Sequence, residues 1–501
     1  NMADAIEVRQ MLAAREDDDE TNLTAATPRR TRSQPAHTDG LLIEGDPLFD
    51  QQWTLRNDMY PVADARVADA WELGVSGEGV VIGLMEGLID TDHPDLIDRL
   101  DIKGSLPLKA LDMPDAHSTA VASIAVAARN GVGMIGAAPR ARIATTPVGT
   151  TLETINAILH DRGRTNIKLA TWGRADRGRL SRLDPATQRA LAKASETTAI
   201  LWAAGNGGPD DRMDYDAFAS SPHVLPVTAV GDLNLRASFG ERSSAHLISG
   251  YSSGNARSVI AAKPGGEWTT RFGGTSAAAP LGAGALARAL EANPDLTPRD
   301  IEHLLVRTAR PIDTRSGVWT TNAAGVAHSD LHGFGAIEAR ALVEAAKAFE
   351  SLSPVQHWSS GEQTVDTALP PPLGSDHGHD DHAHCDHPPI WVEHEIAGPN
   401  GLTIEHALLD LDIDTEHVGS LHIELVSPGG TTAVFSDPRQ DQQDDLKGRP
   451  FLSRKHWGEA AAGMWRVRIA DAQPGTRAKW NSVQLRLRGY ESPGRTETDD
   501  G

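Results

Sequence analysis

The sequence predicts an α/β fold with a doubly wound, mostly parallel sheet, followed by an all-β jelly roll or sandwich. Short runs such as 80–85 and 199–204 are apolar at every position, which is typical of parallel strands buried on both faces. Helical patterns lie between successive runs of this kind, and this alternation indicates a parallel sheet. After residue 390 the pattern changes to short alternating strands, which indicates a sandwich.

Length and charge narrow the function classes. A chain of 501 residues is too long for one ordinary core, so we expect two or more domains. The net charge of −22 argues against nucleic-acid binding and fits cationic substrates or divalent cations. Cys385, the single cysteine, excludes an intrachain disulfide, and no apolar run reaches the ~18 residues of a membrane span.

The first residues leave two localisations open. Asn1 before Met2 resembles a tag remnant. If Met2 is the true start, the absence of a charged-then-apolar leader favours a cytoplasmic protein. If the numbering begins inside a longer chain, a secreted or periplasmic protein is the alternative.

Residues 1–45 are expected to form a polar extension. They contain an acidic run at 16–20 and a basic cluster at 29–32. Such a composition is typical of a solvated tail. The basic cluster could instead be a processing or self-inhibition site.

Residues 46–352 are expected to form the first domain. The buried run 80–85 is its first strand, and the small residues after His117 and the alanine-rich run after Ser276 predict buried helices. The other segments follow the same periods. We expect strands at 80–85, 143–148, 167–172, 199–204 and 224–230, and helices at 62–73, 117–128, 151–161, 185–195, 277–291, 297–308 and 336–349.

Residues 353–389 are predicted to be a linker. Prolines 370–372 precede a tract, 376–387, that contains five histidines and Cys385. Imidazole and thiolate bind Zn²⁺, Ni²⁺ or Cu²⁺, but the tract lacks the fixed spacing of a structural zinc site. A solvated tract without metal is therefore the alternative.

Residues 390–490 are expected to form the all-β domain, and residues 491–501 a tail. Gly, Pro and Asp turns separate the alternating runs. We expect strands at 408–413, 421–426, 432–435, 463–470 and 483–487.

Three candidate catalytic side chains stand in chain order. Glu86 ends a buried strand, where α/β sheets place functional residues. His117 and Ser276 each begin a helix, whose positive dipole end favours developing negative charge. Ser276 alone could be a simple helix cap. The order carboxylate, histidine, serine is that of the subtilisin triad.

Several motifs resemble the kexin/furin branch of the subtilisin-family serine proteases, the proprotein convertases. They are DPLF at 46–49, TWGRAD at 171–176, GNGG at 205–208, YSSG at 251–254 and GTSAAAP at 274–280. The later runs FLS at 451–453 and HWGE at 456–459 resemble the P domain that follows kexin-type catalytic domains. The resemblance covers roughly residues 46–490.

The resemblance implies a role for each site residue. Ser276 is the expected nucleophile, His117 the general base and then acid, and Asn206 the oxyanion donor. Glu86 stands where the family has Asp, and its extra methylene must be absorbed by movement of the backbone or of His117. An impaired pseudoprotease that binds basic peptides or a partner protein is the alternative.

Two further departures concern neighbouring positions. Ser118 stands where the family has Gly, and Gly87 stands where the kexin branch has an acid for a second basic residue, so strict dibasic preference is not expected. The resemblance places three acids near the S1 pocket, which implies substrates with Arg or Lys before the cut. These acids are Asp176, Asp211 and Asp216, and loop acids of an acidic protein are the alternative.

The resemblance also implies two calcium sites. Asp46, Asp95 and Asn130 match one, together with backbone carbonyls of 127–134. The second comprises Asp176, Asp211 and Glu241. Oxygen ligands from separate loops suit Ca²⁺, although Asp46 and Asp95 could be ordinary turn residues.

Together these features predict a calcium-stabilised endopeptidase that cleaves polypeptides after basic residues, with a P domain that buttresses the catalytic domain. The rival hypotheses are the pseudoprotease and a protein whose β domain is a working adhesive module.

Overall fold

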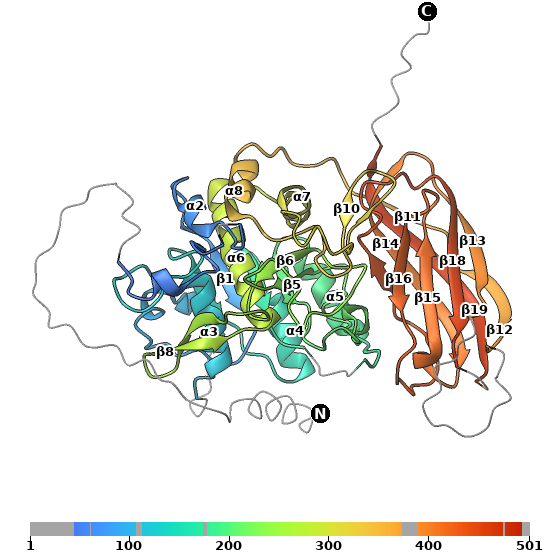
Figure 1. The fold of residues 1–501 in the computed structure, drawn as a ribbon, viewed down its shortest axis with the longest axis horizontal. Coiled ribbons are helices and arrows are strands. Elements are labelled where there is room, and N and C mark those ends of the chain that lie inside the picture. The colour runs from blue at the N-terminus through green and yellow to red at the C-terminus, as the bar shows by residue number, and fades with distance from the viewer. Residues whose placement is uncertain are drawn as a thin grey trace, which may run out of the picture.

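The computed structural model describes residues 45–60, 62–106, 113–173, 178–372, 389–473 and 476–492. An α/β body lies beside a β sandwich formed by later residues (Figure 1). The elements of the two parts give the fold class predicted from the sequence, which is thereby confirmed.

The α/β body is built on six parallel strands in the order β2-β1-β3-β4-β5-β6. Nearly all of their residues are buried, as the continuous apolar runs predict. The strands are β1 (Val81–Leu84), β2 (Arg142–Thr145), β3 (Ile167–Ala170), β4 (Ala199–Ala203), β5 (Leu225–Val230) and β6 (Ile248–Tyr251).

Helices cover both faces of this sheet. One core joins α2, α3, α6, α7 and α8 to one face, and a second core joins α4 and α5 to the other. The helices are α2 (Val67–Trp71), α3 (Ala116–Val126), α4 (Thr151–Leu159), α5 (Pro185–Ala194), α6 (Thr275–Ala292), α7 (Pro298–Thr308) and α8 (Ala339–Lys347). Within the described ranges, no helix is both long and apolar enough to cross a membrane.

The buried helix α6 is the centre of the body. Its residues are buried from Thr275 to Leu290. Small residues allow this, since a Cβ on Gly284 would lie 2.5 Å from Ala137 Cβ. A hairpin of β7 (Val259–Lys263) and β8 (Glu267–Phe272) leads directly into α6, and a shorter hairpin joins β9 (Thr320–Thr321) to β10 (Ala327–His328).

The sandwich consists of two antiparallel sheets. One has the order β11-β19-β14-β17, with β12 also paired to β19, and the other has the order β13-β18-β15-β16. The strands are β11 (Gln356–Ser359), β12 (Gln363–Leu369), β13 (Val392–Gly398), β14 (Leu402–Thr415), β15 (Leu421–Val426), β16 (Thr432–Ser436), β17 (Phe451–Ser453), β18 (Gly463–Asp471) and β19 (Ala478–Glu491).

The prediction that residues 353–389 form a linker is wrong for part of that range. Residues 356–359 and 363–369 are β11 and β12, and both pair with β19 of the sandwich. Their side chains are mostly exposed, so the apolar pattern of a buried strand is weak there. The histidine-rich tract, including Cys385, lies outside the described residues, as do the extension 1–44 and the tail from residue 493.

Two buried carboxylates join the body to the sandwich. Glu302 of α7 accepts a hydrogen bond from Arg454 Nε at 2.8 Å and contacts His406 Nε2 at 2.7 Å. Glu405 of β14 accepts a hydrogen bond from Arg299 Nη2 of α7 at 2.6 Å. Because buried charges are tolerated only when they are paired, these contacts bind the two parts to each other.

Candidate active site

Ser276 lies on the tight turn between β8 and α6. Gly274, the N-cap of the helix, has φ of +70°, which an L side chain rarely adopts. Asn206 Oδ1 accepts hydrogen bonds from Thr275 N at 2.9 Å and Thr275 Oγ1 at 3.1 Å. With its oxygen bound in this way, Asn206 keeps its Nδ2 group to donate beside the turn that carries Ser276.

The hydroxyl of Ser276 is buried against the backbone that directly follows β3. Its Oγ donates a hydrogen bond to the Thr171 carbonyl at 3.1 Å. Ser276 is the second residue of α6, where the first N–H groups have no partner within the helix. This position favours negative charge that develops next to the hydroxyl.

Glu86 and His117 form an acid–imidazole pair. Glu86 Oε2 lies 3.6 Å from His117 Nδ1. Glu86 Oε1 accepts hydrogen bonds from Thr171 N at 2.5 Å and from Thr171 Oγ1 at 2.6 Å. The His117 ring packs against Phe272, the last residue of β8, with ring centroids 5.6 Å apart. The pair therefore adjoins the turn that carries Ser276.

The sheet explains why these side chains meet. Glu86, Thr171 and Asn206 follow β1, β3 and β4, which are neighbours in the parallel sheet. Their carboxyl ends open at one edge, the usual place of function in such sheets. His117 and Ser276 reach the same edge from the starts of α3 and α6. The structure thus brings together all four predicted catalytic residues.

The two other departures from the family pattern lie next to each other. A Cβ added to Gly87 would lie 2.9 Å from Ser118 Oγ and 3.3 Å from Asp115 Oδ2. Asp115 caps α3 and accepts hydrogen bonds from Ser118 N at 2.8 Å and Ser118 Oγ at 2.5 Å. Asp115 therefore supplies a carboxylate beside Gly87. Asp115 is not among the residues predicted from the sequence, although an N-cap Asp two residues before His117 is a usable signal.

The predicted substrate acids have different surroundings. Asp216 Oδ1 accepts hydrogen bonds from the N–H groups of Phe218 and Ala219, and its Oδ2 lies 3.1 Å from where a Cβ on Gly173 would be. Asp216 thus faces the segment that follows Thr171. Asp176 lies outside the described residues.

Asp211 and Glu241 both line the turn that contains Asn206. Glu241 Oε1 accepts a hydrogen bond from Gly207 N at 2.7 Å. A Cβ on Gly207 would collide with the Asp211 carboxylate, which shows how closely that carboxylate approaches the turn. Both side chains are buried, so the turn carries two acids at the edge of the site.

Asp46 and Asp95 each have one buried carboxylate oxygen with no hydrogen-bond partner among the described residues. Asp46 Oδ1 accepts hydrogen bonds from Asn130 N and Gly131 N, and Asp95 Oδ2 accepts them from Met134 N and Trp268 Nε1. Within the described residues, Asp46 Oδ2 and Asp95 Oδ1 are buried and accept no hydrogen bond. Burial, with a smaller contribution from the Asp46 charge, raises the pKa of Asp95 to about 7.

Two such oxygens fit a divalent cation that prefers oxygen ligands. Among the described residues, no group of three or more His, Cys, Asp or Glu side chains is arranged to hold a metal ion. A calcium ion at Asp46 and Asp95 would therefore also need the Asn130 amide oxygen and backbone carbonyls, which is the ligand type that the sequence analysis expected.

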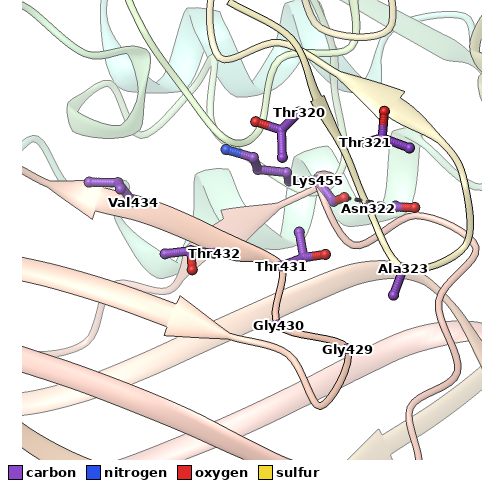
Figure 2. A pocket seen from close by; sticks show the side chains of 10 residues that line it. All are labelled: Thr320, Thr321, Asn322, Ala323, Gly429, Gly430, Thr431, Thr432, Val434 and Lys455. Carbon is purple, nitrogen blue, oxygen red and sulfur yellow. Dashed lines mark hydrogen bonds between the residues drawn. The ribbon is translucent and has the colours of Figure 1, made fainter.

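A separate cavity of about 470 Å³ opens at the junction of the two parts (Figure 2). It lies between the β9 hairpin and the turn that joins β15 to β16. Hydroxyl groups and Lys455 line it, and Lys455 Nζ pairs with Asp330 at 3.1 Å. None of the four predicted catalytic residues lines this cavity.

The α/β body and the β sandwich each match a known protein family. Residues 77–335 match the subtilase family, and residues 404–487 match the proprotein convertase P-domain. The chain is 30% identical to kexin of Saccharomyces cerevisiae over 491 residues, which cover 90% of this chain and 58% of kexin. It is also 30% identical to the dibasic-processing endoprotease of Schizosaccharomyces pombe, with 95% of this chain and 71% of that protein covered.

A further relative and a solved structure agree with this match. Neuroendocrine convertase 2 of Rattus norvegicus is 30% identical, with 89% of this chain and 74% of that protein covered. The crystal structure of a serine protease of Aeromonas sobria matches with a TM-score of 0.76 at 22% identity and covers 93% of this chain and 99% of that one. At this identity the likeness concerns the fold. The chain spans less than two thirds of the length of kexin.

Proposed function

Because the chain belongs to the subtilase family of serine proteases and carries a proprotein convertase P domain, we propose that it is an endopeptidase that cleaves polypeptides after basic residues. Glu86, His117 and Ser276 are the proposed triad. The observation that carries the proposal is the convergence of these side chains and Asn206 at the carboxyl edge of the sheet.

The proposed mechanism uses each of these groups at a stated atom. Ser276 Oγ leaves the Thr171 carbonyl and attacks the scissile carbonyl while His117 takes its proton. Asn206 Nδ2 donates to the oxyanion, and Glu86 stabilises the imidazolium. His117 then protonates the leaving amine, and a water molecule hydrolyses the acyl-enzyme by the reverse roles.

The proposed preference for a basic P1 residue rests on the acids around the site. Asp216 faces the backbone at Gly173, and Asp211 lies beside the turn of Asn206. Carboxylates attract Arg and Lys side chains, which are the residues implied by the name of the dibasic-processing relative. Asp115 beside Gly87 supports recognition of a second basic residue, although its bonds to Ser118 reduce the charge that it offers.

We further propose that Asp46 and Asp95 bind calcium through their unpartnered oxygens. The ion would join the segment around Asp46 to the loop that contains Asn130 and so stabilise both. A second ion at Asp211 and Glu241 is proposed on the resemblance alone, since Asp176 lies outside the described residues.

Peptide binding without turnover is the second candidate function. The distance of 3.6 Å between Glu86 Oε2 and His117 Nδ1 is longer than a normal hydrogen bond, and this favours peptide binding without turnover. A misplacement near 1 Å can cost about 10²-fold in rate. Such a protein would bind basic peptides through the same acids.

Hydrolysis of fluorogenic Arg-containing peptides in the presence of Ca²⁺ distinguishes the two. We expect Ser276→Ala to lower kcat on the order of 10⁴-fold or more, because it removes the nucleophile. A serine-directed phosphonate should label wild type at Ser276. Equal rates for wild type and Ser276→Ala, with no labelling, would reject the protease and leave peptide binding.

A further inference from the structure

We propose that Thr171 is the positioning residue that allows the longer acid Glu86 to serve His117. The inference rests on the proposed function, because it concerns how the proposed triad is held. It goes beyond that function in assigning a role to a side chain outside the triad.

The sheet register places Thr171 opposite Glu86. In the parallel pair of β1 and β3, Leu84 pairs with Leu169, so the residues two places further along both strands are Glu86 and Thr171. The backbone continues the ladder by one bond, from Met85 N to Leu169 O at 2.8 Å. The two side chains therefore meet just beyond the end of the sheet.

Thr171 binds only one of the two carboxylate oxygens. Its N–H and its hydroxyl both donate to Glu86 Oε1, at 2.5 and 2.6 Å, while Oε2 faces His117. A glutamate has one more rotatable bond than an aspartate, so its carboxylate needs more restraint to keep one oxygen aimed at an imidazole. Two donors on the other oxygen provide that restraint.

Burial makes this restraint effective. Glu86 and Thr171 are both about 5% exposed or less, so water competes little for the carboxylate. The Thr171 carbonyl also accepts the hydrogen bond of Ser276 Oγ at 3.1 Å. One residue thus contacts both the proposed acid and the proposed nucleophile.

The hydroxyl can be separated from the backbone in an experiment. Thr171→Val keeps the side-chain shape and the N–H but removes the hydroxyl, and Thr171→Ser keeps the hydroxyl. Thr228→Val is the matched control, because the Thr228 hydroxyl is buried on β5 and has no hydrogen-bond partner in the part of the chain that the structure describes. All variants are compared by melting temperature, and Thr171→Ala replaces Thr171→Val if the latter does not fold.

We expect Thr171→Val to lower kcat on the order of 10-fold to 100-fold with KM changed less than about twofold, because the hydroxyl acts on the acid and not on substrate binding. Thr171→Ser should retain kcat within about threefold, and Thr228→Val should be unchanged. In a Glu86→Asp background the shorter acid no longer reaches the hydroxyl, so Thr171→Val should change kcat less than about threefold.

Two results would overturn the inference while the proposed function stands. One is a wild-type kcat in Thr171→Val, and the other is an equal loss in the Glu86 and Asp backgrounds, which would mean a structural role only. A wild type no faster than Ser276→Ala would instead reject the proposed function, and this inference with it.

Discussion

At Gly87 the backbone passes so close to α3 that any side chain would contact Ser118. The Ser118 hydroxyl cannot simply turn away, because it is bound to Asp115 at 2.5 Å. Two departures from the family pattern are therefore one structural change: the serine after His117 requires the glycine after Glu86.

Restoring the family acid at Gly87 should therefore destabilise this protein. We expect Gly87→Asp to lower the free energy of unfolding by about 1–3 kcal/mol, since it crowds Ser118 and adds a charge beside Asp115. Ser118→Gly should recover much of that loss. Urea unfolding of both single variants and the double variant measures the coupling, and additive effects within about 0.5 kcal/mol would contradict it.

The residues that could be recognised from the sequence are those whose type and order carry chemistry. Glu86, His117 and Ser276 are predicted in this way, and the structure places Glu86 3.6 Å from His117 and Ser276 against the Thr171 carbonyl. Thr171 and Asp115 were not assigned these contacts, because they depend on which strands are neighbours and on how α3 begins. A linear pattern does not contain that information.

At the scale of elements, two separate loops of the body meet at the proposed calcium site. Asp46 and Asp95 come from separate loops, and both have a buried oxygen with no partner among the described residues. Without a cation, the two carboxylates repel each other, as the raised pKa of Asp95 reflects in part.

Removal of calcium should therefore lower the melting temperature. A ligand present at 100 times its Kd stabilises by about 2.7 kcal/mol, which corresponds to about 4–5 °C for a domain of this size. We expect EDTA to cause a shift of this order in wild type and in Asp92→Asn, whose side chain is exposed. Asp95→Asn should abolish most of the shift. An unchanged shift in Asp95→Asn would contradict calcium binding there.

The elements also show where sequence patterns fail. Strands buried on both faces, such as β1 and β4, were predicted because every residue is apolar. The strands β11, β12 and β13 were missed because exposed polar side chains interrupt their pattern. β17 has only three residues, and β6 contains Ser249 and Gly250, so neither has a pattern long enough to recognise.

At the scale of the whole molecule, the junction is held by buried charge. Three basic side chains lie within 3.3 Å of the Glu405 carboxylate: Arg299, His303 and Arg488. Burial alone would raise the pKa of Glu405, but these partners lower it to about 2. The sandwich thus depends on α7 of the body, and α7 on the sandwich.

Neutralising Glu405 should therefore separate the two parts or unfold them. Removing one partner of a buried ion pair costs about 3–5 kcal/mol, because the other charges stay buried without compensation. We expect a loss of this size for Glu405→Gln in urea unfolding. Asp414→Asn, at an exposed position of the same strand, should cost less than about 1 kcal/mol. Equal effects would show that the junction does not depend on this charge.

Acidification should weaken the molecule through its buried histidines. Burial lowers the pKa of His246 to about 3 and of His328 to about 4, although Asp330 near both opposes the shift. In the unfolded chain these histidines have pKa values near 6.5. The unfolded state therefore binds more protons than the folded state between about pH 6.5 and 4. Stability is therefore complete above about pH 6.5 and falls as the pH is lowered toward 4.

Urea unfolding between pH 7.5 and 4.5 tests this expectation. Each histidine contributes up to about 1.4 kcal/mol per pH unit to the slope. His328→Gln should reduce the slope of unfolding free energy against pH by about one such contribution. The glutamine amide can replace the contact of His328 Nε2 with the His246 carbonyl, and it does not titrate. A slope unchanged in this variant would exclude His328 as a source.

The position of β19 in the sandwich has a consequence for how the protein is made. β19 pairs with β11, β12 and β14, all of which precede it in the chain. During synthesis these three strands leave the ribosome without their common neighbour, and unpaired strand edges invite aggregation. The sheet that carries Glu405 can close only after β19 has emerged, so until then the α/β body has no complete sheet to pack against. Synthesis as far as β19 is therefore needed before the contacts of Glu405 with α7 can form on a complete sheet.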